Sequence, residues 1–307
     1  MSANLPEAMI REAGPGLGNL APDDRLRSVV DATLRAHGLS MLTVTDVCPS
    51  TPAAPFWPAS FFELERLSAF RGADPDVQDA IVRHCGEDLL QEALHIETIG
   101  LAFSARMVLL ADTVEERSLH ALFAAEEAAH LSGLSRFGVR RPAQDPFLAL
   151  LAALVAAGDR PSLVLVVQVV LEGWGLDHYR RLARASTDVA LTDVLEGIVR
   201  DEARHHGSGL LAAPRLGHSD ATLDVLTRFL DMVRMGPQAV VGALEAHAGP
   251  LARSARLRAF TELDTEAHSA RRLDLVRELL LRAGAQPVVT ALESRGCFRP
   301  LTAEEVA

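Results

Sequence analysis

Two short segments, Glu127-Ala-Ala-His130 and Glu202-Ala-Arg-His205, decide how this sequence is expected to fold. Residues three apart on an α-helix differ by about 60° in direction and about 4.5 Å in height, so the Glu and the His of each segment project from one face. Two side chains placed in this way can bind the same metal ion. A single Glu-x-x-His segment is common by chance in helices. Two such segments are stronger evidence for a metal site if each is accompanied by a further ligand.

Each segment has a glutamate at the same distance before it. Glu97 lies 30 residues before Glu127, and Glu172 lies 30 residues before Glu202. Three residues therefore recur as a set after 75 residues. The first set is Glu97, Glu127 and His130, and the second set is Glu172, Glu202 and His205.

The turns that join the helices are indicated by signals that do not involve these glutamates. Thr113-x-x-Glu116 is a capping box, which opens a helix after a turn near Asp112. Ser186 or Thr187 is expected to cap the corresponding helix of a second hairpin. Each glutamate then lies 15 residues from its turn, and an antiparallel hairpin places such residues at the same height. The expected helices cover about residues 87–111, 113–137, 159–185 and 187–211.

Four carboxylates at one level of a helical bundle need a compensating charge, because buried unpaired charges are strongly unfavourable. Two divalent cations supply four positive charges, and neutral imidazoles complete the ligand set. A mixture of oxygen and nitrogen ligands suits iron or manganese better than calcium. We therefore expect two iron ions, with manganese as an alternative, at a site formed by Glu97, Glu127, His130, Glu172, Glu202 and His205.

At these residues the sequence resembles the ferritin-like di-metal carboxylate superfamily, which takes one Glu from each of two helices and Glu-x-x-His from each of the other two. The resemblance covers about residues 87–211. It implies an all-α fold, a ferritin-like four-helix bundle with additional N- and C-terminal helices. Asp201-Glu202-Ala-Arg204-His205 resembles the form found in oxygen-activating members, such as bacterial monooxygenases and acyl-carrier-protein desaturases, where the first acid orients a ligand histidine. The first repeat departs from this form, with Ala129 in place of the arginine.

The sequence divides into three expected regions. Residues 1–58 contain a loose tail, a modest helix over 24–37 and a proline-rich loop over 49–58. Residues 59–212 form the di-metal bundle, beginning with a short helix over 59–70. Residues 213–307 form a C-terminal helical extension packed on the bundle, with helices over about 221–247 and 251–283.

Composition excludes several classes of protein. The formal charge is −11 and basic residues occur in doublets only, so no nucleic-acid partner is expected. The three cysteines form no CxxC pair, which argues against rubredoxin, iron–sulfur and zinc-ribbon centres and suits a reducing cytosol. The N-terminus lacks a signal-peptide pattern, and the most apolar stretch, residues 147–171, is interrupted by Gly158-Asp-Arg-Pro161. We expect a cytoplasmic protein without a membrane span.

The expected function is that of a di-iron oxidoreductase, which activates O2 to oxidise or oxygenate a small organic substrate. Since no electron-transfer motif is fused to the bundle, a separate electron donor is expected. The alternatives are a ferritin-like peroxidase or ferroxidase, a manganese catalase, a tRNA-modifying di-iron hydroxylase and a metal-free structural bundle. The helix containing residues 162–171 is apolar nearly all round, so either the C-terminal helices or a second subunit should cover it. We favour a homodimer.

Other polar residues near the motifs have simpler interpretations. Glu92-Ala-Leu-His95 is a third Glu-x-x-His, but it has no partner at matching height, so His95 is expected at the surface or behind a ligand. His206 is expected to be structural. A solvated face is expected for Glu262, Glu266 and His268. Glycines 173 and 175 follow Glu172 and indicate either close helix packing or room for substrate.

Overall fold

The computed structural model describes residues 25, 26, 29, 54–138 and 146–307. Every regular element within these residues is helical, which confirms the all-α class. The tail, most of the helix predicted over 24–37 and the first part of the proline-rich loop lie outside the described residues. The described helical part of the chain divides into two compact units, residues 90–138 with 146–163 and residues 54–89 with 164–307. The three-region division predicted from the sequence stays a prediction.

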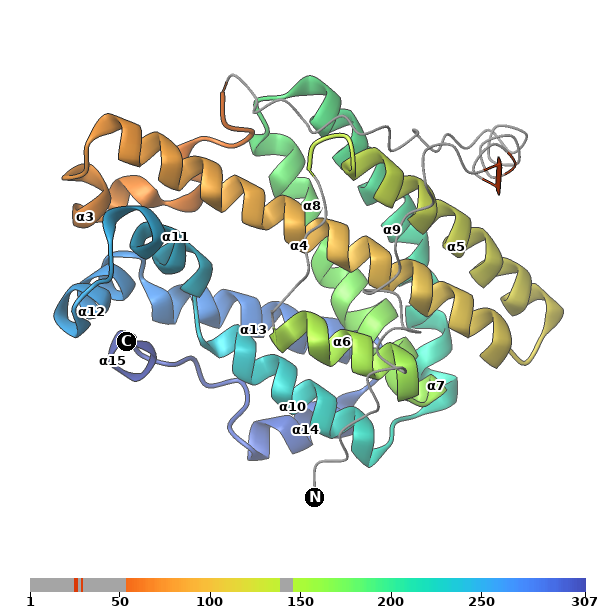
Figure 1. The fold of residues 1–307 in the computed structure, drawn as a ribbon. Helices are drawn as coiled ribbons and strands as arrows, with labels where there is room; N and C mark the ends of the chain where they lie inside the picture. The colour runs from red at the N-terminus through yellow and green to blue at the C-terminus, as the bar shows by residue number, and fades with distance from the viewer. Residues whose placement is uncertain (1–24, 27–28, 30–53, 139–145) are drawn as a thin grey trace. The chain divides into compact units, whose positions relative to one another are not determined.

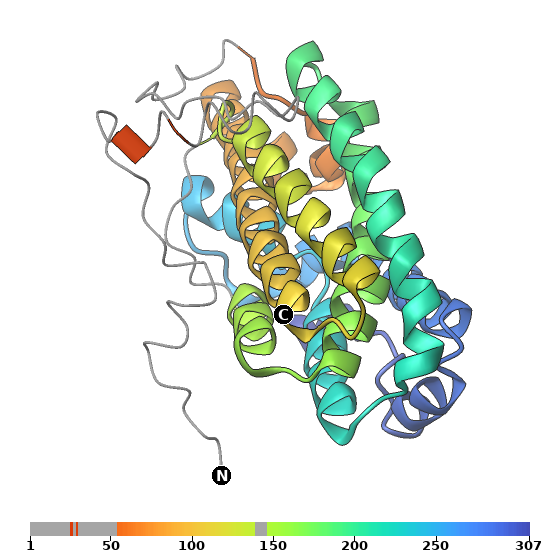
Figure 2. The same cartoon turned by 90° about the vertical axis from the view of Figure 1, so that its right-hand side faces the viewer.

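The first unit contains the second half of α4 (Pro75–Leu110), α5 (Val114–Leu134), α6 (Pro146–Ala157) and α7 (Arg160–Ser162). The second half of α4 runs beside α5 in both views (Figures 1 and 2). The Thr113 side chain accepts the Glu116 N–H at 3.1 Å, which confirms the predicted start of α5. The Glu116 carboxylate reaches back to the Asp112 N–H at 3.2 Å. The helix ends at Leu134, slightly earlier than predicted.

Ionic and capping contacts hold α6 and α7 to this hairpin. Arg160 forms ion pairs with the carboxylates of Asp112 and Glu116. The Asp159 side chain accepts the Ser162 N–H at 2.8 Å, at the start of the helix predicted from residue 159. The Arg106 guanidinium donates to the Gly158 carbonyl at 2.7 Å. The loop between α4 and α5 is thereby fixed by charges from α7.

In the second unit, a hairpin of α8 (Glu172–Ala185) and α9 (Val189–Leu216) follows a π-helix, η3 (Leu163–Leu171). The sequence predicted one ordinary helix from residue 159 to 185, which is wrong for this stretch. The Asp188 side chain caps α9 by accepting the Leu191 N–H at 2.8 Å, so the predicted cap at Ser186 or Thr187 is also wrong. Thr187 instead donates its hydroxyl to the Pro55 carbonyl at 2.8 Å.

A close helix contact accompanies the π-helix. A Cβ atom on Gly209 of α9 would lie 2.6 Å from Cβ of Gln168, so only glycine permits this approach. Nδ1 of His206 is 3.1 Å from the Gln168 carbonyl oxygen. The side chains of residues 163–170 are buried within a single chain.

The remaining helices of the second unit are shorter than predicted. The segment 221–247 forms α10 (Asp220–Arg234) and α11 (Gln238–Ala248), broken at Gly236 with φ +72° followed by Pro237. The segment 251–283 forms α12 (Arg253–Glu262) and α13 (Thr265–Arg282), broken at Asp264 with φ 50°. Two further helices, α14 (Gln286–Ser294) and α15 (Ala303–Val306), were not predicted from the sequence. The elements η1 (Ala59–Phe62), η2 (Leu64–Arg66) and α3 (Ser68–Arg71) replace the single helix predicted over 59–70.

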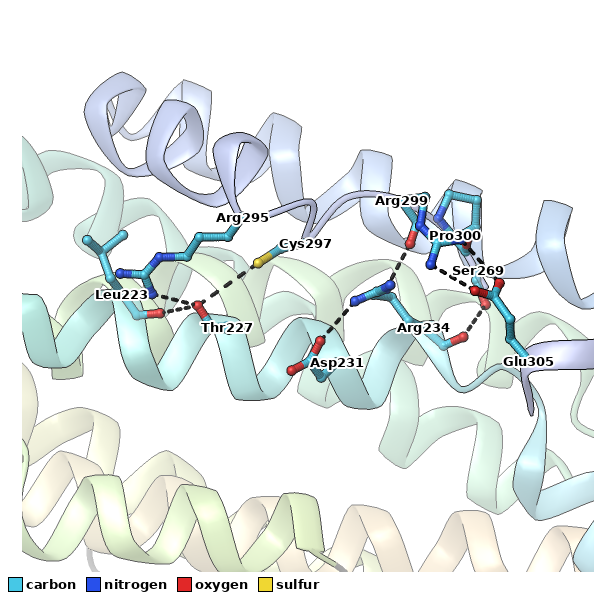
Figure 3. A network of polar contacts seen from close by, with 10 residues as sticks. All are labelled: Leu223, Thr227, Asp231, Arg234, Ser269, Arg295, Cys297, Arg299, Pro300 and Glu305. Carbon is cyan, nitrogen blue, oxygen red and sulfur yellow. Dashed lines mark hydrogen bonds and ion pairs between the residues drawn. The ribbon is translucent and has the colours of Figure 1, made fainter. Parts of the chain in front are cut away.

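A polar network fastens the C-terminal segment to α10 (Figure 3). The Arg234 guanidinium donates to the Arg299 carbonyl at 2.8 Å. Arg299 in turn holds the Glu305 carboxylate with two bonds, 2.9 and 3.1 Å long. A core of apolar side chains from η2, α3, α4, α11, α12 and α15 lies within the same unit.

Only α4, among the described helices, is long and apolar enough to cross a membrane by length and composition. Half of its most apolar window is buried, as in the core helix of a soluble protein, which passes the same test. A single such helix is weak evidence for a membrane span.

Candidate metal centre

The residues of the first set meet between α4 and α5. Nδ1 of His130 lies 3.1 Å from Oε2 of Glu97 and 3.7 Å from Oε2 of Glu127. One ligand atom from each residue lies within 4.8 Å of the others. The exposed fractions of Glu97 and Glu127 are only 2% and 3%. The hairpin therefore buries two carboxylates around one imidazole.

Gly100, one turn after Glu97, makes room for this arrangement. A Cβ atom on Gly100 would lie 2.7 Å from Oε2 of Glu127 and 2.8 Å from its carboxyl carbon. The Glu127 carboxylate thus rests against the bare backbone of α4. A repeated pattern in the sequence could have indicated this residue. Gly100 and Gly175 each follow the first glutamate of a set by three positions.

The residues of the second set also meet within one hairpin. Nδ1 of His205 lies 3.5 Å from Oε1 of Glu202, and a ligand atom from each of Glu172, Glu202 and His205 lies within 4.8 Å of the others. Glu202 and His205 are buried, with exposed fractions of 5% and 0%. Glu172 as a whole is half-buried.

The two glycines after Glu172 have different surroundings. A Cβ atom on Gly173 would lie 2.6 Å from Leu279 and 2.8 Å from the His206 ring, so Gly173 serves close packing. A Cβ atom on Gly175 would meet only Tyr179, at an ordinary 3.9 Å. Packing therefore explains one glycine and leaves space at the other. His206 is buried against Gly173, and desolvation lowers its pKa, as expected for a structural histidine.

Each set fits a divalent cation by its donors and by their spacing. Two ligands bound to one ion at about 2.0–2.2 Å lie no more than about 4.4 Å apart, close to the spacing found in both sets. Two carboxylates with one imidazole also carry a net negative charge, and a divalent ion would balance that charge. Both sets consequently form buried clusters of Glu and His that could hold a metal ion.

The acids before the motif glutamates differ between the sets. Oδ1 of Asp201 accepts a hydrogen bond from the Arg204 guanidinium at 2.7 Å. Glu126 is half-buried, and Ala129 stands where an arginine would pair with it. The Asp-Glu-x-Arg-His pattern therefore forms an ion pair within α9, beside the second set.

Several of the simpler interpretations need correction. His95 is buried, so the surface alternative is wrong for it, whereas Glu92 is exposed. Glu262 does not belong to a solvated face, because its Oε2 accepts the Ser68 N–H at 2.8 Å at the start of α3. Glu266 is exposed as predicted, whereas His268 is half-buried.

Comparisons with known proteins add no family to these observations. No protein-family model, no curated protein and no solved structure matches the chain.

Proposed function

We propose that this protein is a di-iron oxidoreductase with a ferritin-like four-helix bundle, which activates O2 to oxidise or oxygenate a small organic substrate. The observation that carries the proposal is the buried Glu, Glu and His set, which occurs twice at identical spacing. In this proposal each set binds one iron ion. The sequence resemblance to di-metal carboxylate proteins supplies the expectation that both ions form one centre.

The ligands assigned to iron are Glu97, Glu127 and His130 for one ion, and Glu172, Glu202 and His205 for the other. When bound, ferrous iron supplies the electrons and the open coordination positions that O2 reduction requires. Burial of Glu97, Glu127, Glu202 and His205 keeps bulk water away from these positions.

The substrate is proposed to lie beside Gly175. There is space beside Gly175 for a side chain, whereas the Glu127 carboxylate fills the corresponding space beside Gly100. The half-buried Glu172 one turn before Gly175 is the ligand nearest to solvent by exposure.

The proposed partners follow from the same reading. Electrons come from a separate donor, since the chain carries no CxxC pair for a fused redox centre. We also propose that the protein is cytoplasmic and forms a homodimer, as expected from the sequence. The acidic charge of −11 makes a tRNA substrate the weaker alternative.

Anaerobic reconstitution with Fe²⁺ followed by O2 tests the proposal. We expect two Fe²⁺ per chain to be oxidised rapidly, with a new near-ultraviolet or visible absorption, and to turn over repeatedly when a chemical reductant is supplied. Glu92→Ala serves as the matched control on α4, because Glu92 is exposed and belongs to neither set. A protein that retains only Mn²⁺ and decomposes hydrogen peroxide would instead be a manganese catalase. Oxidation no faster than that of free Fe²⁺ would contradict the proposal.

A further inference from the structure

A pair of histidines outside both sets brings two ring nitrogens together at the surface of the second unit. Nδ1 of His84, on the N-terminal part of α4, lies 3.0 Å from Nε2 of His247, at the end of α11. The two rings are nearly perpendicular, at 87°. The residues are 163 positions apart in the chain, so the contact is made by the fold and not by local sequence.

We propose that His84 and His247 form a surface site for a divalent transition-metal ion, Zn²⁺ in the first instance, with Asp88 as the carboxylate that orients His84. The site lies outside both Glu and His sets and does not rest on the proposed oxidoreductase function.

The spacing of the two nitrogens suits a shared ion. Zinc binds imidazole nitrogen at about 2.0–2.1 Å, so two nitrogens on one ion at angles between 90° and 109° lie about 2.8–3.4 Å apart. The observed 3.0 Å falls within this range.

The other nitrogen of His84 has the partner that a metal-bound histidine usually has. Nε2 of His84 lies 3.5 Å from Oδ2 of Asp88, one helical turn further on. A carboxylate near Nε2 favours the tautomer with the proton on that atom, which would leave the Nδ1 lone pair for an ion. Metal-binding histidines commonly donate their second N–H to such a carboxylate.

The neighbouring groups define what else the ion would bind. Cys85 is buried among apolar side chains of the core, so the adjacent thiol is not assigned to the ion. Arg83 is drawn to Asp79 by an ion pair of 2.6 Å. Since His84 is half-buried and His247 is exposed, water can fill the remaining coordination positions. Nitrogen ligands favour Zn²⁺, Ni²⁺ or Cu²⁺ over Mg²⁺ and Ca²⁺.

Equilibrium dialysis against Zn²⁺, followed by metal analysis, tests the site in the full chain. The wild-type protein is compared with His247→Gln and His84→Gln, and His218→Gln, an exposed histidine elsewhere, is the matched control. The Glu and His sets are the same in all four proteins, so their contribution cancels. We expect the wild type and His218→Gln to bind one Zn²⁺ more than either pair variant. Co²⁺ added in place of Zn²⁺ should give a visible absorption that depends on both histidines.

Asp88→Asn provides a second measurement that keeps both imidazoles. It should weaken Zn²⁺ binding by about 10- to 100-fold, the usual effect of removing a carboxylate that orients a ligand. Circular dichroism confirms that each variant is helical. Equal zinc content and affinity in the wild type and His247→Gln would overturn the proposal. If the histidine variants fail to fold, unchanged zinc affinity in Asp88→Asn would overturn it.

Discussion

The two sets share their residue types and their spacing, yet they differ in how closely their surroundings hold them. In the first set, His130 contacts both carboxylates and Gly100 lets Glu127 rest on the backbone of α4. In the second set, His205 is 3.5 Å from Glu202, Glu172 is half-buried, and no close neighbour occupies the space at Gly175. A π-helix also ends immediately before Glu172.

This difference suggests a division of roles within a repeated motif. A glycine at the same position allows a ligand to lie close in one hairpin and leaves space in the other. π-Helical turns occur frequently at functional sites, because they displace a helix from regular α spacing. We expect the first set to be the rigid side of the proposed centre and the second set to be the side where ligands exchange.

The largest expected effect comes from removing one carboxylate in each hairpin. Glu127→Ala should lose at least the ion of the first set, and Glu202→Ala at least that of the second, since each leaves one carboxylate with an imidazole. Both variants should remain helical. Elemental analysis after reconstitution measures the loss, with Glu92→Ala retaining both ions. If Glu92 proved necessary for metal and Glu97 did not, the register assigned to α4 would be wrong.

Alanine at the two equivalent glycines sharpens the contrast between the hairpins. Gly100→Ala places a Cβ atom where the Glu127 carboxylate lies, so it should displace that ligand and weaken metal binding at the first set. Gly175→Ala should leave metal bound and stabilise α8 by up to about 1 kcal/mol, because alanine is the better helix former. Metal titration and thermal unfolding of both variants are the measurements. Equal metal affinity in both would remove the distinction.

Neutralising the acid before each motif glutamate should give a smaller effect. Asp201→Asn removes the acid that the resemblance assigns to orienting a ligand histidine, and it should weaken metal affinity or activity by about 10- to 100-fold. Glu126→Gln is the corresponding change at the first set, where Ala129 stands in place of the arginine of the motif. Metal competition assays on the two variants compare these effects. If Asp201→Asn behaves like the wild type, Asp201 lies on a solvated face of the helix and has no effect on the metal.

The smallest expected effect concerns acid stability around α8 and α13, which pack together beside the second set. Desolvation, followed by the charges of Arg272 and Arg271, lowers the pKa of His268 from 6.5 to about 4. This histidine must charge on unfolding, so its contribution is fully present above pH 6.5 and is lost as the pH falls toward 4. His268→Gln should therefore lose less unfolding temperature between pH 7.5 and pH 5 than the wild type. An identical loss in both proteins would exclude His268 as a source of acid sensitivity.

The sequence predicted the hairpins well and their details poorly. The Thr113 and Asp159 caps follow from local chemistry, and both are observed. The helix breaks at Gly236 and Asp264 were not predicted, because they depend on positive φ values and tertiary contacts that hydrophobic periodicity does not reveal. The π-helix was also not predicted. It accompanies a tertiary contact, the close approach of Gly209 to Gln168.

For the site, side-chain type and spacing were sufficient to assemble each set, because a Glu three residues before a His shares its helix face. The role of Gly100 was not predicted, although the Glu-x-x-Gly repeat is present in the sequence. Its role depends on which neighbour fills the space, and only the packed hairpin determines that. The burial of His95 likewise depends on packing around α4.

The metal content of the purified chain tests the central claim most directly. Reconstitution with Fe²⁺ under anaerobic conditions, removal of loosely held ions and elemental analysis should give two iron ions per chain. The same count is expected in the His247→Gln variant, which removes the surface histidine pair from the measurement. One ion or none, in a sample that is fully helical by circular dichroism, would contradict the account.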